Sequence, residues 1–348
     1  MTYKTFGSSD RTTTRTLLHE SIPVTGTMVS GTYNTTSNTD GVTREQNIKT
    51  YSHGMFQSIY DYPHLSSSAN HIFDISLGYG SSSTLSGSTN SDNSKKINMY
   101  NQMEQGLVGY DSSGNIRVFD AIGNFAETND VKHKEAVFLN FSRLLVKDEI
   151  KKGSFSITLG VHASHDTPFN TVATYTDADA VNNYNVNSPA GEFAVLKKVG
   201  DASTAYGLIY YQAGIVVLAT GSLGTGTIDE TPARNIQHSL VSSSINKVAD
   251  GIRNRVQKLS FNNTTELNSS IYFCRANHNE FNYSSNPTYL TGSKIVVKND
   301  QADGAPRSYI TTVGLYSADN ELLAVAKLSE PLKKTPDNDV TLRVRLDY

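Results

Sequence analysis

The C-terminal end of the chain carries the pattern that most restricts its fold. Over residues 340–347 apolar and polar side chains alternate without a break, and Val340, Leu342, Val344 and Leu346 share one face. Successive side chains of a β-strand point to opposite sides of a sheet, so this period of two predicts a half-buried strand. We therefore expect the end of the chain to be tied into a sheet.

A β-hairpin is predicted just before this strand. Residues 309–316 and 321–328 are rich in apolar and β-branched side chains, and they flank Ser317-Ala318-Asp319-Asn320, a run of turn-favouring residues. Similar patterns predict strands over residues 71–78, 136–141, 154–159, 192–199, 207–211 and 214–219. The expected fold is α+β, dominated by strands in antiparallel sheets.

One amphipathic helix is clear, over residues 236–259, where apolar residues recur near the helical period and most basic residues fall off that stripe. The apolar set is Ile236, Leu240, Ile245, Val248, Ile252, Val256 and Leu259, and the basic set is Lys247, Arg253, Arg255 and Lys258. A shorter helix is predicted over residues 98–108, because Met99, Met103 and Leu107 recur at the spacing of one helical face.

Three segments are expected along the chain. Residues 1–60 lack apolar periodicity and are dense in Thr, Ser, Asn and Gly, so they predict an extended N-terminal arm that a neighbour orders. Residues 61–190 predict a β-rich domain with the short helix. Residues 191–348 predict a second β-rich domain with the amphipathic helix, the hairpin and the final strand. A polar stretch over residues 80–94 is expected to be a mobile surface loop.

The composition excludes several functional classes. The 348 residues carry a net charge of −3, and charged residues make up 18%, against about 25% in typical domains. A near-neutral chain has no general electrostatic attraction to nucleic acid or anionic lipid. No apolar run reaches the roughly 18 residues of a membrane span, and no secretory signal is evident at the N-terminus.

The single cysteine, Cys274, cannot form an internal disulfide. It lies in a predicted strand, where a small buried thiol is expected rather than a nucleophile. These features favour a chain made in a reducing cytoplasm, with neither a nucleic-acid nor a membrane partner.

The cluster His162, His165 and Asp166 is the strongest candidate for a metal site, since imidazole and carboxylate groups suit zinc or iron. No helix presents the two histidines on one face, and no remote third ligand is indicated. We therefore interpret these three residues as polar side chains at the point where the chain leaves a strand. We expect no metal ion or cofactor.

Three other motifs also favour structural interpretations. Asp177 and Asp179 lack the further oxygen ligands of an EF-hand, so a solvated loop is expected. The glycine-rich residues 223–227 lack the lysine of a P-loop and predict a flexible connection. The basic side chains of the 236–259 helix could contact phosphate, but a solvated helix face is expected. No motif predicts catalysis.

Several segments resemble virion structural proteins of contractile-tailed bacteriophages, notably cyanophages and their marine relatives. They are KKINMYNQM with the following GYD, VFLNFSRLLVKDEIKKGSF, NEFNYSSNP, YITTVGLY and NELLAVAKLS, which cover residues 95–103, 109–111, 137–155, 279–287, 309–316 and 320–329. The resemblance extends in order from about His71 to Tyr348 and does not include the N-terminal arm.

This resemblance implies a non-enzymatic structural subunit of a phage virion that binds copies of itself or other tail proteins. The hairpin is similar to hairpins of tail and baseplate-associated proteins, which favours a baseplate wedge component. A neck or head-associated protein is the first alternative. A receptor-binding or glycan-degrading tail protein is the second, although no repeat and no tryptophan supports a sugar site.

Overall fold

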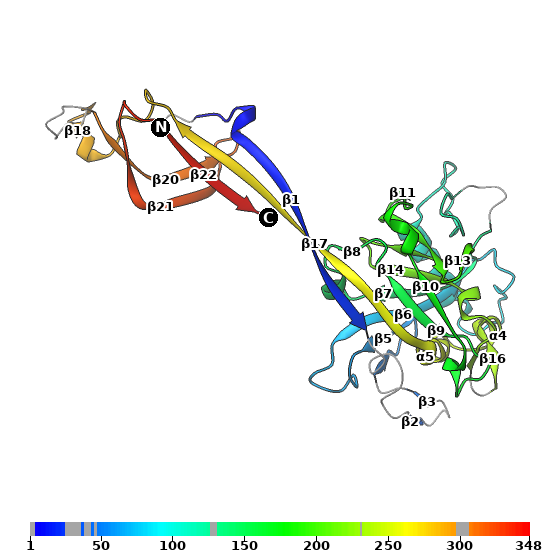
Figure 1. Cartoon of the computed structure of the whole chain (residues 1–348). Helices are drawn as coiled ribbons and strands as arrows, with labels where there is room; N and C mark the ends of the chain where they lie inside the picture. The colour runs from blue at the N-terminus through cyan, green and yellow to red at the C-terminus, as the bar shows by residue number, and fades with distance from the viewer. Residues whose placement is uncertain are drawn as a thin grey trace. The chain divides into compact units, whose positions relative to one another are not determined.

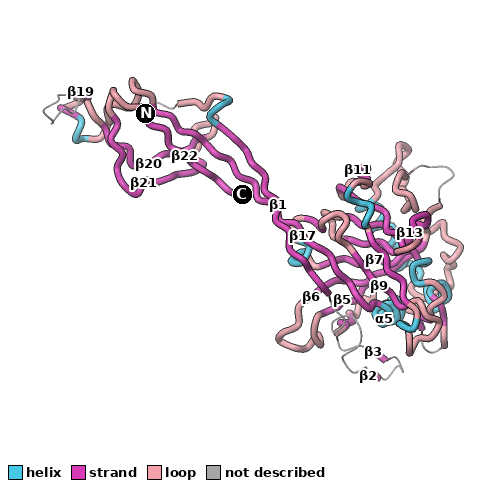
Figure 2. Tube along the Cα trace, viewed as in Figure 1, coloured by secondary structure: helices cyan, strands magenta, loops and turns pink. Residues whose placement is uncertain are grey.

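Antiparallel strands dominate the computed structural model of the chain (Figure 1). The structure describes residues 4–24, 36–37, 43–44, 47–125, 131–229, 232–296 and 306–348. Figure 2 shows that strands far outnumber helices there, and each strand pair with a described register is antiparallel. The expected β-dominated α+β fold is confirmed.

The chain forms two units that differ from the three expected segments. Unit 1 contains residues 1–17 and 266–348, and unit 2 contains residues 18–265. The division therefore lies inside β1 (Arg11–Val24) and inside β17 (Val256–Ala276).

Neither expected boundary holds. Within the predicted arm, β4 (Ile48–Thr50) pairs with β5 (Phe56–Tyr60) in unit 2, and Ile48 and Ile59 are buried there. The boundary at residue 190 separates β11 (Asn185–Ser188) from β12 (Gly191–Lys198), which pair with each other. Most of the Ser/Thr-rich stretch over residues 30–42 lies outside the described residues.

A large antiparallel sheet forms the body of unit 2. Its strand order is β17-β9-β10-β12-β13-β14-β7-β6-β5-β4, with β11 beside β12 and β8 beside β17. The bounds not yet given are β6 His71–Tyr79, β7 Glu135–Phe141, β8 Glu149–Ile150, β9 Ser156–Gly160, β10 Val172–Thr176, β13 Asp201–Tyr210 and β14 Ile215–Ala219. Short strands β15 (Thr227–Asp229) and β16 (Arg234–Asn235) pair separately, as do β2 (Thr36–Ser37) and β3 (Thr43–Arg44).

Both faces of this sheet are buried. In β7, Val137 and Leu139 belong to one hydrophobic cluster, and Ala136 and Phe138 belong to another. Because neighbouring side chains of a strand point to opposite faces, each cluster lies on its own side of the sheet. This double burial explains why residues 136–141 form a nearly continuous apolar run instead of an alternating one.

Helices contribute to each cluster. Helix α2 (Asn93–Leu107) supplies Met99, Tyr100 and Leu107 to one, whereas α4 (Ile236–Ser242) and α5 (Ile245–Arg255) supply residues to the other. A further short helix is α3 (Arg143–Val146). The predicted short helix is confirmed, although it begins five residues earlier than expected.

The single helix expected over residues 236–259 is wrong in its extent. Ser244 ends the first part, because its hydroxyl accepts a hydrogen bond from the Lys247 amide and caps α5. Val256 and Leu259 sit at helical spacing but lie in β17, where they pair with Leu159 and Ile157 of β9. Their burial in the sheet outweighs the local helical pattern.

Two glycines allow helices to approach strands closely. A Cβ atom at Gly78 in β6 would lie 2.3 Å from the Lys96 carbonyl oxygen of α2. One at Gly251 in α5 would lie 2.2 Å from the Ile228 carbonyl oxygen of β15. Gly251, unfavourable for helix formation by itself, therefore serves tertiary packing.

Unit 1 contains the predicted hairpin and final strand. The hairpin is β20 (Ser308–Tyr316) with β21 (Leu322–Lys334), and the final strand is β22 (Val340–Asp347), paired along its length with β17. Short strands β18 (Leu290–Thr291) and β19 (Lys294–Ile295) form a second small hairpin.

Candidate functional site

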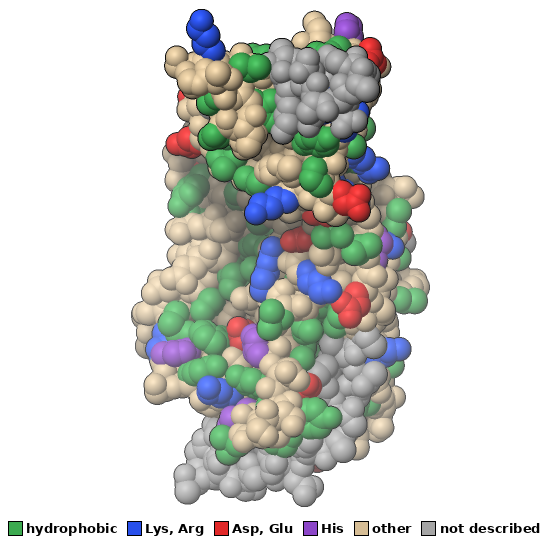
Figure 3. All heavy atoms as spheres, turned by 90° about the vertical axis from the view of Figure 1, so that its left-hand side faces the viewer, with side chains coloured by type: hydrophobic (Ala, Val, Ile, Leu, Met, Phe, Trp, Pro, Cys, Tyr) green, Lys and Arg blue, Asp and Glu red, His purple; other side chains and the backbone are tan. Residues whose placement is uncertain are grey.

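The described part of unit 1 exposes many large hydrophobic side chains. Each of them is at least 38% exposed: Phe6, Leu17, Leu267, Phe281, Tyr283, Ile295, Val296, Tyr309, Tyr316, Leu322, Leu323, Val325, Leu332 and Tyr348. On the face of the molecule that Figure 3 shows, hydrophobic side chains lie among neutral ones and the charged side chains are scattered. Scattered charges of both signs do not favour a polyanionic partner.

These side chains remain exposed because the described residues of unit 1 form no large hydrophobic core. The two buried hydrophobic clusters found among the described residues draw all their members from residues 48–261, within unit 2. Among the residues of unit 1 that the structure describes, the buried hydrophobic ones are Ala276, Tyr289, Leu315 and Val340, and each keeps 6% to 9% of its surface exposed. These large apolar side chains of the described part of unit 1 therefore face solvent.

One group of exposed apolar residues lies at the hairpin tip. We define the tip cluster as Gly314, Tyr316, Leu322, Leu323 and Val325. Tyr316 pairs with Leu322 and Gly314 pairs with Val325, so these four share one face. A Cβ atom at Gly314 would lie 3.0 Å from Tyr316 Cε2 and 3.3 Å from Leu322 Cδ1, so both side chains cover the glycine.

The turn that presents the tip cluster is held by its own hydrogen bonds. The Ser317 amide donates to the Glu321 carbonyl at 2.8 Å, and the Ser317 hydroxyl accepts from the Asp319 and Glu321 amides. Asn320 adopts a left-handed conformation with φ of 64°, which asparagine tolerates well. The predicted turn residues thus fix the position of the exposed cluster.

Polar contacts hold much of the rest of unit 1. The fully buried Lys334 donates to the His278 carbonyl at 3.1 Å and to Asn282 Oδ1 at 2.8 Å. Arg275 of β17 pairs with Asp10 at 2.8 Å, which anchors part of the predicted arm. Hydrogen bonds and ion pairs order this unit while leaving its apolar side chains outside.

The structure does not assemble a metal site from His162, His165 and Asp166. His162 Nδ1 accepts from the Ser164 amide at 3.2 Å, and His165 Nδ1 lies 3.8 Å from Asp166 Oδ1. Across the residues that the structure describes, no group of three or more His, Cys, Asp or Glu side chains could hold a metal ion.

Arg255 instead organises this loop through its buried guanidinium. It donates to the carbonyl oxygens of Gly160, His162, Ser164 and Thr227 at 2.7–3.2 Å. Burial lowers its pKa to about 10.

The solvated helix face expected for the basic residues is therefore wrong for Arg255, and also for Arg253, which is fully buried. Lys258 is exposed but lies in β17 instead of a helix. Gly226 of the glycine-rich segment leaves the space that the Arg255 guanidinium fills, since a Cβ atom there would lie 2.3 Å from Nη1.

Asp177 is a buried acceptor and not a solvated loop residue. Its carboxylate accepts from the amides of Gly153 and Phe155 and from the Tyr211 hydroxyl at 2.8–2.9 Å. Burial raises its pKa, and these hydrogen bonds act in the opposite direction. Asp177 therefore connects neighbouring segments of unit 2, which the sequence does not predict.

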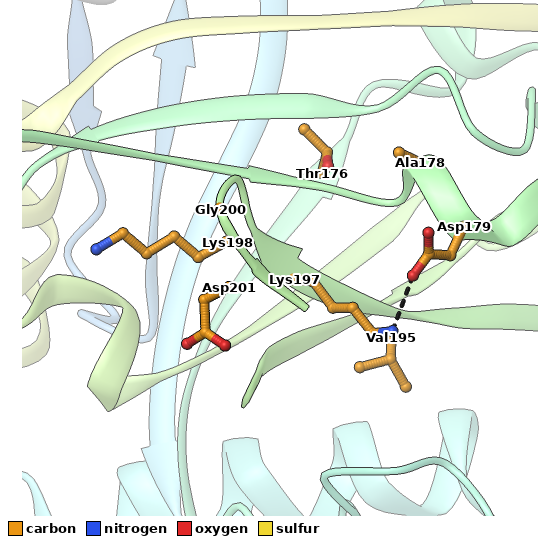
Figure 4. Close-up of a pocket in the computed structure, with 8 residues that line it drawn as sticks. All are labelled: Thr176, Ala178, Asp179, Val195, Lys197, Lys198, Gly200 and Asp201. Atoms are coloured by element: carbon orange, nitrogen blue, oxygen red, sulfur yellow. Dashed lines mark hydrogen bonds and ion pairs between the residues drawn. The ribbon is translucent and has the colours of Figure 1, made fainter. Parts of the chain in front are cut away.

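A pocket of about 340 Å³ lies beside Asp179, which is exposed as expected. Figure 4 shows Asp179 and Lys197 directed toward each other, and their ion pair measures 2.8 Å. The Asp201 carboxylate accepts hydrogen bonds from Ser203 and Thr204 of its own turn. These hydrogen bonds lower its pKa to about 2. The acidic groups of this pocket thus serve the local structure.

The sequence does not predict that two ionisable side chains of α2 are buried. Lys96 is fully buried, and its ammonium donates to the carbonyl oxygens of Ser91, Leu240 and Ser243 at 2.6–2.7 Å. Burial lowers its pKa to about 8. The ammonium satisfies carbonyls at the end of α4, a favourable place for positive charge.

Glu104, on the same helix, lies in a largely apolar environment. Burial raises its pKa to about 8, and the Tyr100 hydroxyl and the Phe119 amide oppose this shift more weakly. A carboxyl group with such a pKa keeps its proton at neutral pH.

Cys274 lies in β17 as predicted but is half-buried instead of buried. Burial raises the pKa of its thiol. A raised pKa disfavours the reactive thiolate, so this cysteine has no activated nucleophile character.

Searches with the chain matched no protein family model, no curated protein and no solved structure. Among the described residues, no helix has the length and apolar character required to cross a bilayer. The exposed apolar surface of unit 1, with the tip cluster as its best-defined part, is the candidate functional site.

We predict that Arg255→Met lowers the free energy of unfolding by about 3 kcal/mol, because several carbonyl oxygens lose the guanidinium donor that they contact in a buried setting. Chemical denaturation monitored by tyrosine fluorescence measures the loss. Lys258→Met, an exposed control, should stay within about 0.5 kcal/mol of the parent. Equal midpoints for Arg255→Met and the parent would contradict the structural role.

We predict a pH-dependent stability difference for Glu104→Gln. With a folded pKa of about 8, above its usual value, the parent's carboxyl stabilises the fold at low pH, and this contribution is lost as pH rises through 8. The free energy of unfolding of the variant, relative to that of the parent, should therefore rise by about 1.4 kcal/mol per pH unit between roughly pH 5 and 8. Urea denaturation across this range tests it, with the exposed Glu321→Gln as control. A constant difference would refute the prediction.

Proposed function

We propose that the chain is a structural subunit of a bacteriophage virion, located in the tail baseplate, that acts through protein–protein contacts instead of catalysis. The observation that carries this proposal is the concentration of exposed apolar side chains in a unit without a large core. Its partners would be copies of itself and other tail proteins.

The energetic argument follows from hydrophobic burial. Fully burying a large apolar side chain contributes about 1.5–3 kcal/mol, so a partner that covers the tip cluster gains several such contributions. The tyrosines suit this role, since they combine a large contact area with a polar group. The hydrogen-bonded turn at residues 317–321 keeps the cluster in place, which reduces the entropy lost on binding.

The placement in a phage particle is supported by the sequence resemblance. The resembling segments include both arms of the hairpin, residues 309–316 and 320–329, and these segments form β20 and the start of β21. The segment that resembles phage tail proteins is therefore the segment that exposes the tip cluster. This coincidence favours the baseplate over a neck or head position.

A direct test uses purified particles of the phage that encodes the chain. Mass spectrometry of these particles should detect the chain, and immunogold labelling should place it at the distal end of the tail. Labelling of the head or neck would instead assign the protein to that part of the particle. Absence from the particles, or turnover of host polysaccharide by the isolated chain, would overturn the proposal.

We predict that Leu323→Glu combined with Val325→Glu lowers incorporation into particles at least about tenfold, because charges would enter an apolar contact. Quantitative mass spectrometry of particles made with each variant measures the effect. Ser329→Glu places a charge on an exposed position of the same strand outside the cluster and should incorporate normally. Circular dichroism checks that both chains fold, and normal incorporation of the double variant would contradict the role of the tip cluster.

A further inference from the structure

Strand β20 has a free edge within the described residues of unit 1. It hydrogen-bonds to β21 in a two-stranded sheet that no other described strand joins. A two-stranded antiparallel ribbon is only marginally stable in water, and three or more strands are usually needed. An additional strand could pair with β20 along the edge that faces away from β21.

The two strands of the hairpin differ in how their edges are protected. Strand β21 carries Lys327, Glu330, Pro331 and Lys333, and its pairing is interrupted between Lys327 and Leu332. Charges, proline and bulges are the usual means of protecting an edge against pairing.

Strand β20 has neither charges nor proline, although the register of the hairpin shifts between its residues Ile310 and Thr312 and between Leu315 and Tyr316. Its sequence SYITTVGLY contains no charged residue and no proline, and it is rich in β-branched and aromatic side chains. Such a strand favours the addition of a further strand.

We infer that β20 pairs with β20 of a second copy of this chain, antiparallel about a two-fold axis at Thr312. This inference rests on the proposed function and names one partner of that surface. The result is a four-stranded sheet in the order β21-β20-β20-β21, with the same residues contributed by both copies.

Charge supports a second copy as the partner. Because β20 is uncharged, pairing with itself places no like charges opposite each other. Unit 1 as a whole contains twelve basic and eleven acidic side chains, so two copies approach without strong net repulsion.

The register also extends the apolar face of the tip cluster onto the second copy. A two-fold axis at Thr312 places Gly314 opposite Ile310 of the partner subunit. Gly314 has no side chain of its own and is covered in part by the Tyr316 ring. An isoleucine on the neighbouring strand extends this apolar face across both copies.

A cysteine cross-link tests the register directly. In the full chain carrying Cys274→Ser, Thr312→Cys should give a disulfide-linked dimer on mild oxidation, because opposed Cα atoms lie about 4.5–5.5 Å apart in an antiparallel pair. The matched control is Ser329→Cys, an exposed position on β21, which should give no disulfide-linked dimer because it lies away from the β20–β20 pair. No dimer from Thr312→Cys, or equal dimer from both, would overturn the inference.

A charge-exchange experiment gives an independent test of the pairing between two copies of β20. Thr312→Glu faces Lys327 in its own hairpin, so the hairpin gains an opposite-charge pair while two copies would oppose glutamates. Its dimerisation, measured by sedimentation, should weaken at least about tenfold. The double variant Thr312→Lys with Lys327→Glu carries the reverse charges, and mixing it with Thr312→Glu should restore a mixed dimer. A mixture that remains monomeric would contradict the pairing.

The outcomes separate this inference from the proposed function. If the chain is absent from particles, the proposed function fails whatever its oligomeric state. If the chain is present in particles but Thr312→Cys forms no cross-link in particles or in solution, the self-pairing of β20 fails alone.

Discussion

The simultaneous burial of both faces of one sheet is the constraint on which unit 2 depends. Alternate residues of β7 enter two separate hydrophobic clusters, so helices must cover the sheet on each side. Gly78 and Gly251 permit this close covering. The same burial lowers the pKa of Lys96 and raises that of Glu104, and Lys96 is held by carbonyl oxygens that need a donor. Packing and unusual ionisation thus have one cause.

Unit 1 differs from unit 2 in this respect. Hydrogen bonds and ion pairs order it, while its large apolar side chains remain exposed. The two units therefore differ in packing: unit 2 contains both hydrophobic clusters, and the described part of unit 1 leaves large apolar side chains exposed. The tip cluster and the uncharged edge of β20 are adjacent features of one hairpin. A partner that adds a strand there would pair with β20 and cover apolar side chains at once.

Local patterns predicted the elements that depend on local chemistry. The hairpin, its turn and the final strand follow from alternation and turn residues, and the structure contains all three. The helix over residues 236–259 was predicted too long, because Val256 and Leu259 have helical spacing but find strand partners in β9. The predicted domain boundaries also fail, since β17 pairs with strands far away in the sequence. The candidate site was only partly predictable: the hairpin was, whereas its exposure was not.

The sequence by itself determined the class of fold and the position of the hairpin, because alternation and turn propensity act over a few neighbouring residues. Only the tertiary structure decided which side chains are buried, because burial depends on segments that lie far apart in the chain. Arg255 illustrates the point: its helical position suggested solvent, but carbonyl oxygens of distant loops surround its guanidinium. Leu323 illustrates the reverse, since its position in a predicted strand does not reveal its burial, and its side chain is 67% exposed.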